Sequence, residues 1–434
     1  MRKLLATTVL IILMSIPVSA QYLYSIDDGK GKLDFHVDCA SFKTDQEDVV
    51  RLEVYYKVFN KYLAFEHLEG RFQAVYEVTF TIFDNKNRQT DGYNRRIDFN
   101  VPTYEKTLSD DDFRTSAANF KIKPGKYKIE CRLDDMAAGK SVEKTIKFNV
   151  RDFNKKYSSV SDIEFVYAVD SASPGSPFNK EDWTIVPSVI RSYGGDSIAP
   201  MVYYYEIYRG KDKRDKVFIE TRILNQKLDA VYFDSLTAEF TDETIRQIRH
   251  INLRGISSGQ YFLDVTLFGR RKKQIDNIRT PFKLSWSPET MIVHDYEGAL
   301  RFLKYIASSG EVKEMKKATD LNERLRLWEE FWRQHDPTPG TEVNEAKRDY
   351  YRRIELANQY FGLMGREGWL TDRGRIFIQF GEPDQMEDNP FESEQKAYQV
   401  WYYYHLSIQR RFVFVDNWGD GDYRLQYPYD GIIR

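Results

Sequence analysis

The stretch that decides the fold is Gly125-Lys126-Tyr127-Lys128-Ile129-Glu130-Cys131-Arg132-Leu133, and its pattern returns in Gly259-Gln260-Tyr261-Phe262-Leu263-Asp264-Val265-Thr266-Leu267. Apolar and polar residues alternate in both copies, which is typical of a half-buried β-strand. The next run keeps the same offset of 134, because Phe148 and Val150 fall on Phe282 and Leu284. The sequence therefore predicts one β-hairpin that occurs twice.

A looser repeat extends this pattern upstream. The alternating residues Leu33, Phe35, Val37 and Cys39 have counterparts in Ile163, Phe165, Tyr167 and Val169. Turn residues interrupt the alternating runs at the spacing of an all-β sandwich. We predict a mainly β chain with two tandem immunoglobulin-like β-sandwiches, at residues 21–152 and 158–286. In such sandwiches a tyrosine hydroxyl binds backbone at a corner, a structural role that we expect for Tyr127 and Tyr261.

The two cysteines, Cys39 and Cys131, occupy inward positions of this pattern. Their counterparts in the second copy are Val169 and Val265, so a plain hydrophobic residue is tolerated at each site. A disulfide between them and a pair of buried free thiols both remain open. Neither C-x-x-C nor a Cys/His metal spacing is present, and the six histidines are scattered. We therefore predict no metal site and no cofactor.

Composition sets broad limits on function. The chain has 434 residues, 41% hydrophobic and 30% charged, which is ordinary globular usage and excludes a collagen-like or largely disordered protein. Lys and Arg number 64 against 66 Asp and Glu, and no basic run stands out. We expect no nucleic-acid partner, because that function requires a concentrated positive surface.

The first twenty residues resemble a secretory signal peptide. Arg2 and Lys3 precede an apolar run over residues 4–16, and small residues lead up to a cleavage site near Ala20. The apolar run is shorter than the ~20 residues of a membrane-spanning helix, and no second such run follows. We expect an exported protein without a transmembrane segment in its mature chain, located in the periplasm or outside the cell.

After Ser287-Pro288 the apolar period changes from 2 to 3.6, which predicts helices at residues 296–307, 320–334 and 342–362. The second predicted helix has an aromatic stripe that we interpret as core, with Trp328, Phe331 and Trp332 on one face. Strands are predicted to return at residues 375–380, 397–404, 411–415 and 423–426. Residues 287–434 are therefore expected to form an α+β domain, with helices packed on a small antiparallel sheet.

Within this region, Gly368-Trp369-Leu370-Thr371-Asp372 and the later Gly381-Glu382-Pro383-Asp384 resemble the GWxTD domain, a bacterial domain at the C-terminus of exported proteins. Supporting marks are Phe331-Trp332, the connector that begins Asp336-Pro337-Thr338-Pro339, Tyr351-Arg352-Arg353, Ala357-Asn358 and Trp401-Tyr402-Tyr403. The resemblance covers residues 315–430 and implies export and β-sandwich companions. It implies no activity, because the family has none assigned.

The pentad has two interpretations. In the first it is a fold signature: Gly368 permits a turn, Trp369 anchors it in the core, and Thr371 or Asp372 caps the turn before a strand. In the second, polar side chains gather at one end of the sheet to hold a ligand, with carboxylates close enough for acid-base chemistry. The candidate ligand or interaction residues are Trp369, Thr371, Asp372, Arg373, Arg375, Glu382, Asp384 and Trp401.

Two further features of the sequence have a structural and a functional interpretation. The run from Asp416 to Asp422 offers oxygen ligands for calcium, but it fails the EF-hand pattern at Trp418, and an Asp-Gly hairpin turn is favoured. Tyrosine-rich runs at residues 203–205 and 401–404 are typical of strands, where half of the side chains face outward and can bind partners or glycans.

No nucleophile or phosphate-binding motif is present, so we assign no catalytic residue. We predict an exported envelope protein that acts as a protein-interaction or assembly module through its C-terminal domain, with the sandwiches as spacers or binding modules. Its partner would be an unknown envelope protein or glycan. The alternatives are a secreted hydrolase with carboxylates near the pentad, and a glycan-binding protein.

Overall fold

The computed structural model describes residues 33–68, 70–109, 111–195, 199–339, 344–363, 366–389, 396–426 and 430–432. The predicted signal peptide and its cleavage site near Ala20 lie outside the described residues. Residues 340–343, which include the predicted start of the third helix, lie outside them as well. The chain divides into two compact units: residues 1–154 with 173–179, and residues 155–172 with 180–434.

The first unit is built from antiparallel strands. These are β1 (His36–Lys43), β2 (Val50–Phe59), β3 (Glu66–Leu68), β4 (Arg71–Asp84), β5 (Gln89–Val101), β6 (Phe113–Ile122), β7 (Gly125–Asp135) and β8 (Lys140–Val150), with helical turns η1 (Asn60–Tyr62) and α1 (Tyr104–Thr107). One sheet has the order β1-β2-β6 and the other β3-β4-β7-β8, with β5 paired to β4. The two sheets meet through buried side chains, such as the rings of Tyr56 and Phe80 at 5.6 Å.

The second unit begins with the strands β9 (Ser159–Val160), β10 (Glu164–Ser171), β11 (Asn179–Lys180), β12 (Trp183–Pro187), β13 (Ser192–Gly195), β14 (Met201–Tyr208), β15 (Lys216–Leu224), β16 (Ala230–Glu239), β17 (Thr244–Ile251), β18 (Gly259–Phe268) and β19 (Gln274–Trp286), with the turn η2 (Arg270–Lys272). One sheet runs β12-β10-β14-β17, with β9 also on β14, and the other runs β13-β19-β18-β15-β16. Phe165 and Phe282 connect the sheets across the core, with ring centroids 5.7 Å apart.

The repeated hairpin is confirmed, because β7–β8 and β18–β19 have the same register. Tyr127 lies opposite Phe148 in the first, and Tyr261 lies opposite Phe282 in the second. The tyrosine hydroxyls also behave alike: Tyr127 donates to the Lys123 carbonyl at 2.9 Å, and Tyr261 donates to the Ser257 carbonyl at 2.7 Å. The paired sheets are consistent with immunoglobulin-like sandwiches, and that finer assignment stays a prediction, as do the domain boundaries.

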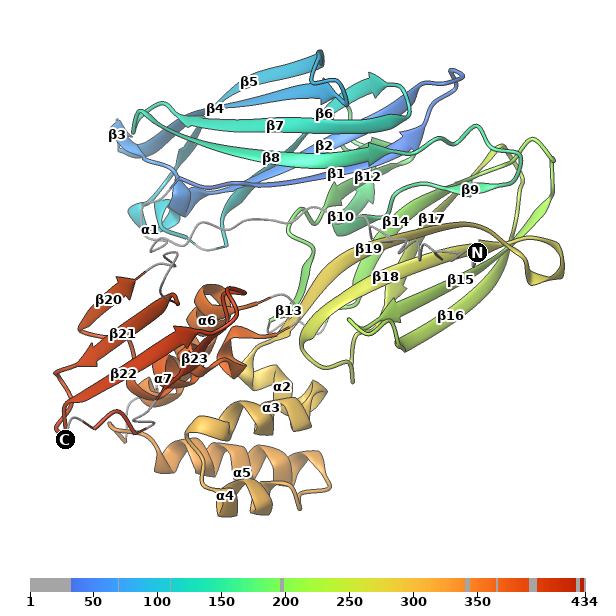
Figure 1. Ribbon diagram of the computed structural model, residues 1–434. Helices are drawn as coiled ribbons and strands as arrows, with labels where there is room; N and C mark the ends of the chain where they lie inside the picture. Colours follow the sequence, from blue (N-terminus) through green and yellow to red (C-terminus); the bar gives the residue numbers. More distant parts are fainter. Residues whose placement is uncertain are drawn as a thin grey trace, which may run out of the picture. The chain divides into compact units, whose positions relative to one another are not determined.

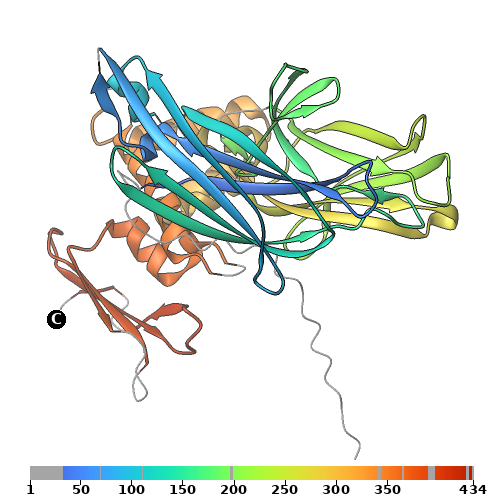
Figure 2. The same ribbon diagram turned by 90° about the horizontal axis from the view of Figure 1, so that it is seen from above.

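The chain ends with helices followed by a small antiparallel sheet, as predicted. The helices are α2 (Pro288–His294), α3 (Tyr296–Phe302), η3 (Leu303–Tyr305), α4 (Ser309–Met315), α5 (Leu321–Gln334), α6 (Glu345–Phe361), η4 (Gly368–Leu370) and α7 (Asp372–Phe380). In the sheet, neighbouring strands follow one another in chain order: β20 (Gln385–Asn389), β21 (Tyr398–Tyr403), β22 (Arg410–Asp416) and β23 (Tyr423–Leu425). Helices α6 and α7 lie on one face of this sheet (Figures 1 and 2).

Local sequence explains where these helices begin. Ser287 accepts a hydrogen bond from the Thr290 N–H, with Pro288 at the first position of α2. Asp320 caps α5 by accepting a hydrogen bond from the Glu323 N–H at 3.0 Å. The aromatic stripe of α5 is buried in the core, which confirms its interpretation: Trp328, Phe331 and Trp332.

One predicted element is wrong: residues 375–380 belong to helix α7 and not to a strand. The apolar run from Ile376 to Ile378 contains β-branched residues, which favoured the strand interpretation. Helix signals flank that run. Thr371 accepts a hydrogen bond from the Gly374 N–H at 3.1 Å and caps the helix, and Gly381 ends it at a φ of 82°. These end signals override the propensity of the apolar run.

The second sandwich and the C-terminal helices share one continuous core. Trp286, the last residue of β19, lies against the ring of His294 at 4.6 Å. The Asp295 carboxylate caps α3 through the Gly298 N–H and also accepts hydrogen bonds from the hydroxyl of Ser257 and the N–H of Ser258. The tyrosine corner of β18 is therefore tied directly to the first helices of the C-terminal domain.

Cys39 and Cys131 are both buried, as predicted, and the structure has no disulfide between them. Burial raises the pKa of Cys131 to about 12, so its reactive thiolate form is strongly disfavoured at neutral pH. Within the described part of the chain, no helix is long and apolar enough to cross a bilayer.

Candidate interaction site

Gly368, the first residue of the pentad, allows three backbone segments to approach closely. A Cβ at this position would lie 1.9 Å from the carbonyl oxygen of Ala357 in α6. A Cβ at Gly374 in α7 would in turn lie 2.0 Å from the carbonyl oxygen of Gly368. Because neither backbone can tolerate a methyl group at that distance, α6, η4 and α7 can stack only with glycine at both positions.

Trp369 anchors this stack, as the fold-signature interpretation predicted. Its side chain is 4% exposed and packs on Phe302 at a ring distance of 4.8 Å. Its indole Nε1 donates to Glu367 at 2.7 Å, and its backbone N–H donates to the Asn358 side chain at 3.1 Å. Tyr305 donates its hydroxyl to the Trp369 carbonyl at 3.1 Å. The polar atoms of this residue are therefore used internally.

Thr371 and Asp372 stabilise the start of α7. The Thr371 hydroxyl donates to the Gly368 carbonyl at 2.7 Å while it accepts from the Gly374 N–H. Asp372, in the first turn, accepts a hydrogen bond from the Leu425 N–H at 2.9 Å and so connects the helix to β23. A carboxylate in this position also interacts favourably with the helix dipole.

The two arginines of α7 are largely enclosed. The guanidinium of Arg373 lies over the rings of Tyr423 and Phe361, at 4.3 Å and 5.2 Å, and it donates to the Gly421 carbonyl. Burial lowers the pKa of Arg373. The Nε of Arg375 is buried and has no hydrogen-bond partner among the described residues. Arg373 therefore joins α7 to the loop before β23.

The predicted carboxylates do not come together. Glu382 and Asp384 follow the C-terminal end of α7, whereas Asp372 lies at its beginning, roughly 13 Å away for a helix of this length. Asp384 is bonded to His405, whose Nδ1 lies 2.8 Å from Oδ2, and this hydrogen bond holds the pKa of Asp384 below its ordinary value. Both Asp384 and Glu382 are exposed. This separation does not favour joint acid-base chemistry at the pentad.

The tyrosine-rich run at residues 203–205 is more buried than the sequence suggested. Tyr203, Tyr204 and Tyr205 are each at most 1% exposed, so none of the three offers a free surface. Trp401 is also buried and packs on Phe414 at a ring distance of 4.7 Å. The expectation that half of these side chains face outward is therefore wrong for residues 203–205.

The loop from Asp416 to Asp422, whose oxygen ligands suggest calcium in the sequence, is organised by one carboxylate. Oδ1 of Asp416 accepts hydrogen bonds from the N–H groups of residues 418, 419 and 420, and Oδ2 accepts from that of Gly421. Burial opposes ionisation of Asp416, but these four donors outweigh it and lower the pKa of Asp416. Among the described residues, no group of His, Cys, Asp and Glu side chains is arranged to hold a metal ion.

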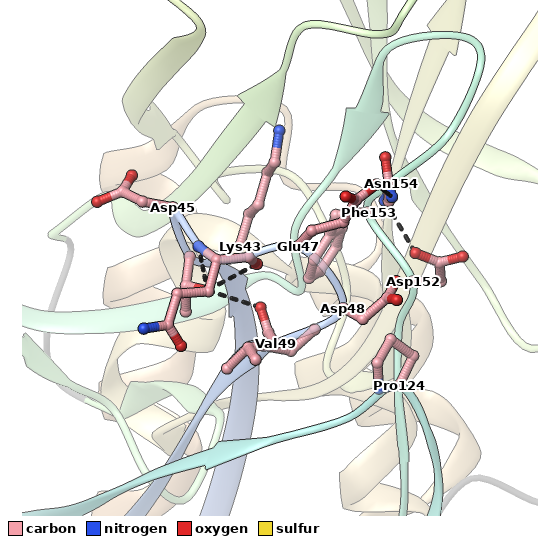
Figure 3. Close-up of a pocket in the computed structure, with 12 residues that line it drawn as sticks. Lys43, Asp45, Glu47, Asp48, Val49, Pro124, Asp152, Phe153 and Asn154 are labelled. Carbon is pink, nitrogen blue, oxygen red and sulfur yellow. Dashed lines mark hydrogen bonds between the residues drawn. The ribbon is translucent and has the colours of Figure 1, made fainter.

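A small pocket of about 220 Å³ lies in the first unit, between the loop after β1 and the segment after β8 (Figure 3). It is lined by acidic and amide side chains, including Glu47 and Asp152. These groups already bind within the loops: Asn154 donates its side-chain amide to Glu47 at 2.7 Å and its backbone N–H to Asp152 at 2.8 Å. The pocket is therefore a hydrogen-bonded loop junction.

A larger groove of about 660 Å³ lies directly beside the pentad. Its apolar floor combines the first helices with the pentad and consists of Leu300, Ala307, Val312, Trp369 and Leu370. Its rim carries four exposed cations, two from α3–η3 and two from α4 and its C-cap: Arg301, Lys304, Lys313 and Lys316. Glu297 is the acidic side chain that lines the groove beside them.

None of these four cations has an ion pair with another residue that the structure describes. Elsewhere in the C-terminal domain, some exposed basic residues have ion pairs, as in Lys317 with Glu314 and Arg333 with Glu330. The groove therefore concentrates uncompensated positive charge around an apolar floor, in a chain whose net charge is −2. Its volume lies within the range of about 300–1,000 Å³ that is typical of ligand pockets.

Of the candidate residues, Trp369 alone lines this groove, and sequence reasoning missed its basic rim. A signal was present: Arg301 and Lys304, like Lys313 and Lys316, are three residues apart and so share a helix face. The sequence could not show that these two basic helix faces line one groove together with Trp369, which lies more than fifty residues further along the chain. The ligand or interaction role of the other candidates stays a prediction.

The elements described above make this a mostly β protein with a C-terminal α+β domain, and the groove lies in that domain. The GWxTD domain family model matches residues 290–428, so this chain contains a GWxTD domain there, and the resemblance seen in the sequence is confirmed. The matched residues include α3, η3 and α4, which carry the four cations of the groove, as well as the pentad.

A search of the curated proteins finds no match to this chain. Among solved structures, it is similar to dimeric latent PorU from Porphyromonas gingivalis, at 10% identity and a TM-score of 0.24, over 58% of this chain and 20% of that one. It is also similar to a glycosyl hydrolase family 2 member from Bacteroides cellulosilyticus, at 8% identity and a TM-score of 0.19, over 53% and 28%. This chain spans less than a third of either protein, and the low TM-scores carry no argument about function.

Proposed function

We propose that this chain is an exported envelope protein that acts as a protein-interaction or assembly module through its GWxTD domain. The two sandwiches, which we take to be immunoglobulin-like, serve as spacers or as further binding modules. The proposal of export rests on the positive start, apolar run and small-residue cleavage site of the first twenty residues.

The observation that carries the proposal is the groove beside the pentad. An apolar floor ringed by exposed charges is the usual anatomy of a recognition surface, with a desolvated centre and a polar rim. Leu370 is 36% exposed at the edge of the pentad, and it extends the apolar surface from buried Trp369 toward solvent. The pentad thus supplies part of the floor while its own polar atoms hold the domain together.

Site-specific photocrosslinking tests this proposal in the cells that produce the protein. A photoreactive phenylalanine analogue replaces Leu370 in the groove or, as a control, Leu321, which is 44% exposed on α5 of the same domain. We expect a discrete crosslinked protein from position 370 and not from position 321. No crosslink from position 370, or the same products from both positions, would count against an interaction through the groove.

A further inference from the structure

The walls of the groove specify what kind of partner it can accept. Two cations, Arg301 and Lys304, come from α3–η3, and two, Lys313 and Lys316, come from α4 and its C-cap. With Glu297 as the acidic lining residue, the side chains that line the groove carry a net positive charge. Because all four cations are exposed and unpaired among the described residues, a ligand could pair with them without first breaking an ion pair.

The floor adds a second requirement. Leu300 is 2% exposed and Trp369 is 4% exposed, so the bottom of the groove is apolar and largely shielded from water. Burial of a large apolar side chain against such a floor contributes about 1.5–3 kcal/mol. A purely acidic ligand would leave this contribution unused, and a purely apolar one would leave the cations unpaired.

The distribution of charge also separates two ligand classes. An amphiphile with one anionic head, such as a fatty acid or a phospholipid, would place its charge on one wall. Cations supplied by two separate elements, α3–η3 and α4, instead match several carboxylates spaced along a chain, because successive residues of an extended peptide advance by about 3.3 Å. A peptide with acidic residues on each side of one apolar residue fits both walls and the floor.

We propose that the groove binds an acidic segment of a partner protein, which inserts one large apolar side chain over Trp369 and Leu370. Its carboxylates pair with Arg301 and Lys304 on one wall and with Lys313 and Lys316 on the other. This inference rests on the proposed interaction function and names the chemistry of the partner. Since the rim charges are exposed, the complex weakens as salt screens them over a distance of about 8 Å at physiological ionic strength.

The test uses a fluorescein-labelled peptide, Ser-Glu-Asp-Phe-Asp-Glu-Ser, with the full mature protein and fluorescence anisotropy as the readout. Two matched peptides replace either the four acidic residues by lysine or the central phenylalanine by serine. We expect the acidic probe to bind, and each matched peptide to bind at least about tenfold more weakly. We also expect the affinity to fall as salt is raised.

Protein variants locate the binding. Lys304→Glu combined with Lys313→Glu reverses one charge on each wall, and Arg326→Glu combined with Arg348→Glu makes the same change in net charge at exposed positions outside the groove. We expect the first variant to lose at least about tenfold in affinity and the second to bind like the wild type. Circular dichroism and thermal unfolding confirm that both variants fold.

Three results would overturn the inference. The acidic probe does not bind, or it binds both variants equally, or vesicles of phosphatidylglycerol bind with the same dependence on Lys304 and Lys313 while the peptide does not. Failure of the inference is distinguishable from failure of the proposed function. A crosslink from position 370 without peptide binding would keep the interaction function and reject an acidic partner segment, whereas absence of the crosslink would reject the function itself.

Discussion

The pentad and the groove beside it share Trp369 and Leu370, yet the two regions use their residues in opposite ways. In the pentad, the backbone of Gly368, the hydroxyl of Thr371 and the indole of Trp369 all bind within the domain. Around the groove, four cations have no ion pair among the described residues. The polar groups of the pentad thus bind within the domain, and the groove that we propose for recognition lies directly beside them. Substitutions can test this difference, because those in the pentad should lower stability whereas those around the groove should leave it almost unchanged.

The largest expected effect comes from Gly368→Ala. The new methyl group would lie 1.9 Å from the Ala357 carbonyl oxygen, so α6 and η4 must separate. We expect a loss of about 3 kcal/mol or more in the free energy of unfolding, measured by denaturant titration. The matched control is Gly310→Ala in α4, where the nearest atom lies 3.9 Å away. Equal stability of the two variants would show that the stack is not close-packed.

A smaller effect is expected for Asp416→Asn, which weakens the four hydrogen bonds that organise the loop before β23. We expect a cost of about 2 kcal/mol at neutral pH, because hydrogen bonds to a charged acceptor are lost. The control is Asp420→Asn, at an exposed position in the same loop.

The effect of Asp416 should also depend on pH. Since the pKa of Asp416 is lowered in the folded protein, its contribution is fully present above the unfolded value of about 4 and is lost as pH falls through the folded value. The melting temperatures of the wild type and of Asp416→Asn should therefore converge in acid. A difference that stays constant with pH would contradict the assignment of the stabilisation to the charged carboxylate.

Thr371→Val should cost about 1 kcal/mol, because it keeps the shape of the side chain but removes the cap of α7 and the hydrogen bond to Gly368. Thr371→Ser retains the hydroxyl and serves as the control. Chemical denaturation of both variants measures the difference. If the valine variant matches the serine variant, the hydroxyl does not hold the pentad in place.

The smallest effect on stability is expected for the groove. Lys304→Glu combined with Lys313→Glu changes exposed side chains without a described ion pair, so the free energy of unfolding should change by no more than about 0.5 kcal/mol. Thermal unfolding measures this directly. A large loss of stability would mean that the rim cations are part of the scaffold, and it would remove the contrast between the two regions.

These contrasts also show what the sequence could predict. The two hairpins and their register were predictable, because alternation has a period of two and Gly-x-Tyr fixes the corner in both copies. The helix α7 was missed because Ile376 and Ile378 favour strands, although Thr371 and Gly381 carried the signals for the ends of a helix. The caps at Thr371 and Gly381, together with the close packing at Gly368 and Gly374, therefore outweigh the strand propensity of these isoleucines.

The candidate site was harder to predict than the fold. The sequence identified Trp369, but the groove needs walls from α3 and α4, and no local pattern shows that these short helices face the pentad. Asp372 and Asp384 are close in sequence, which suggested a shared site, but α7 places them at its opposite ends. Proximity along the chain was therefore a poor guide to convergence in space.

The central claim is that the groove, to which the pentad contributes Trp369 and Leu370, is the binding surface, whereas the polar groups of the pentad hold the domain together. The most direct measurement is photocrosslinking from position 370 in three backgrounds: wild type, Lys304→Glu with Lys313→Glu, and Arg326→Glu with Arg348→Glu. We expect a discrete crosslinked protein in the wild type and in the second variant pair, and its loss in the first. A product that persists after charge reversal in the groove, or no product in any background, would contradict the account.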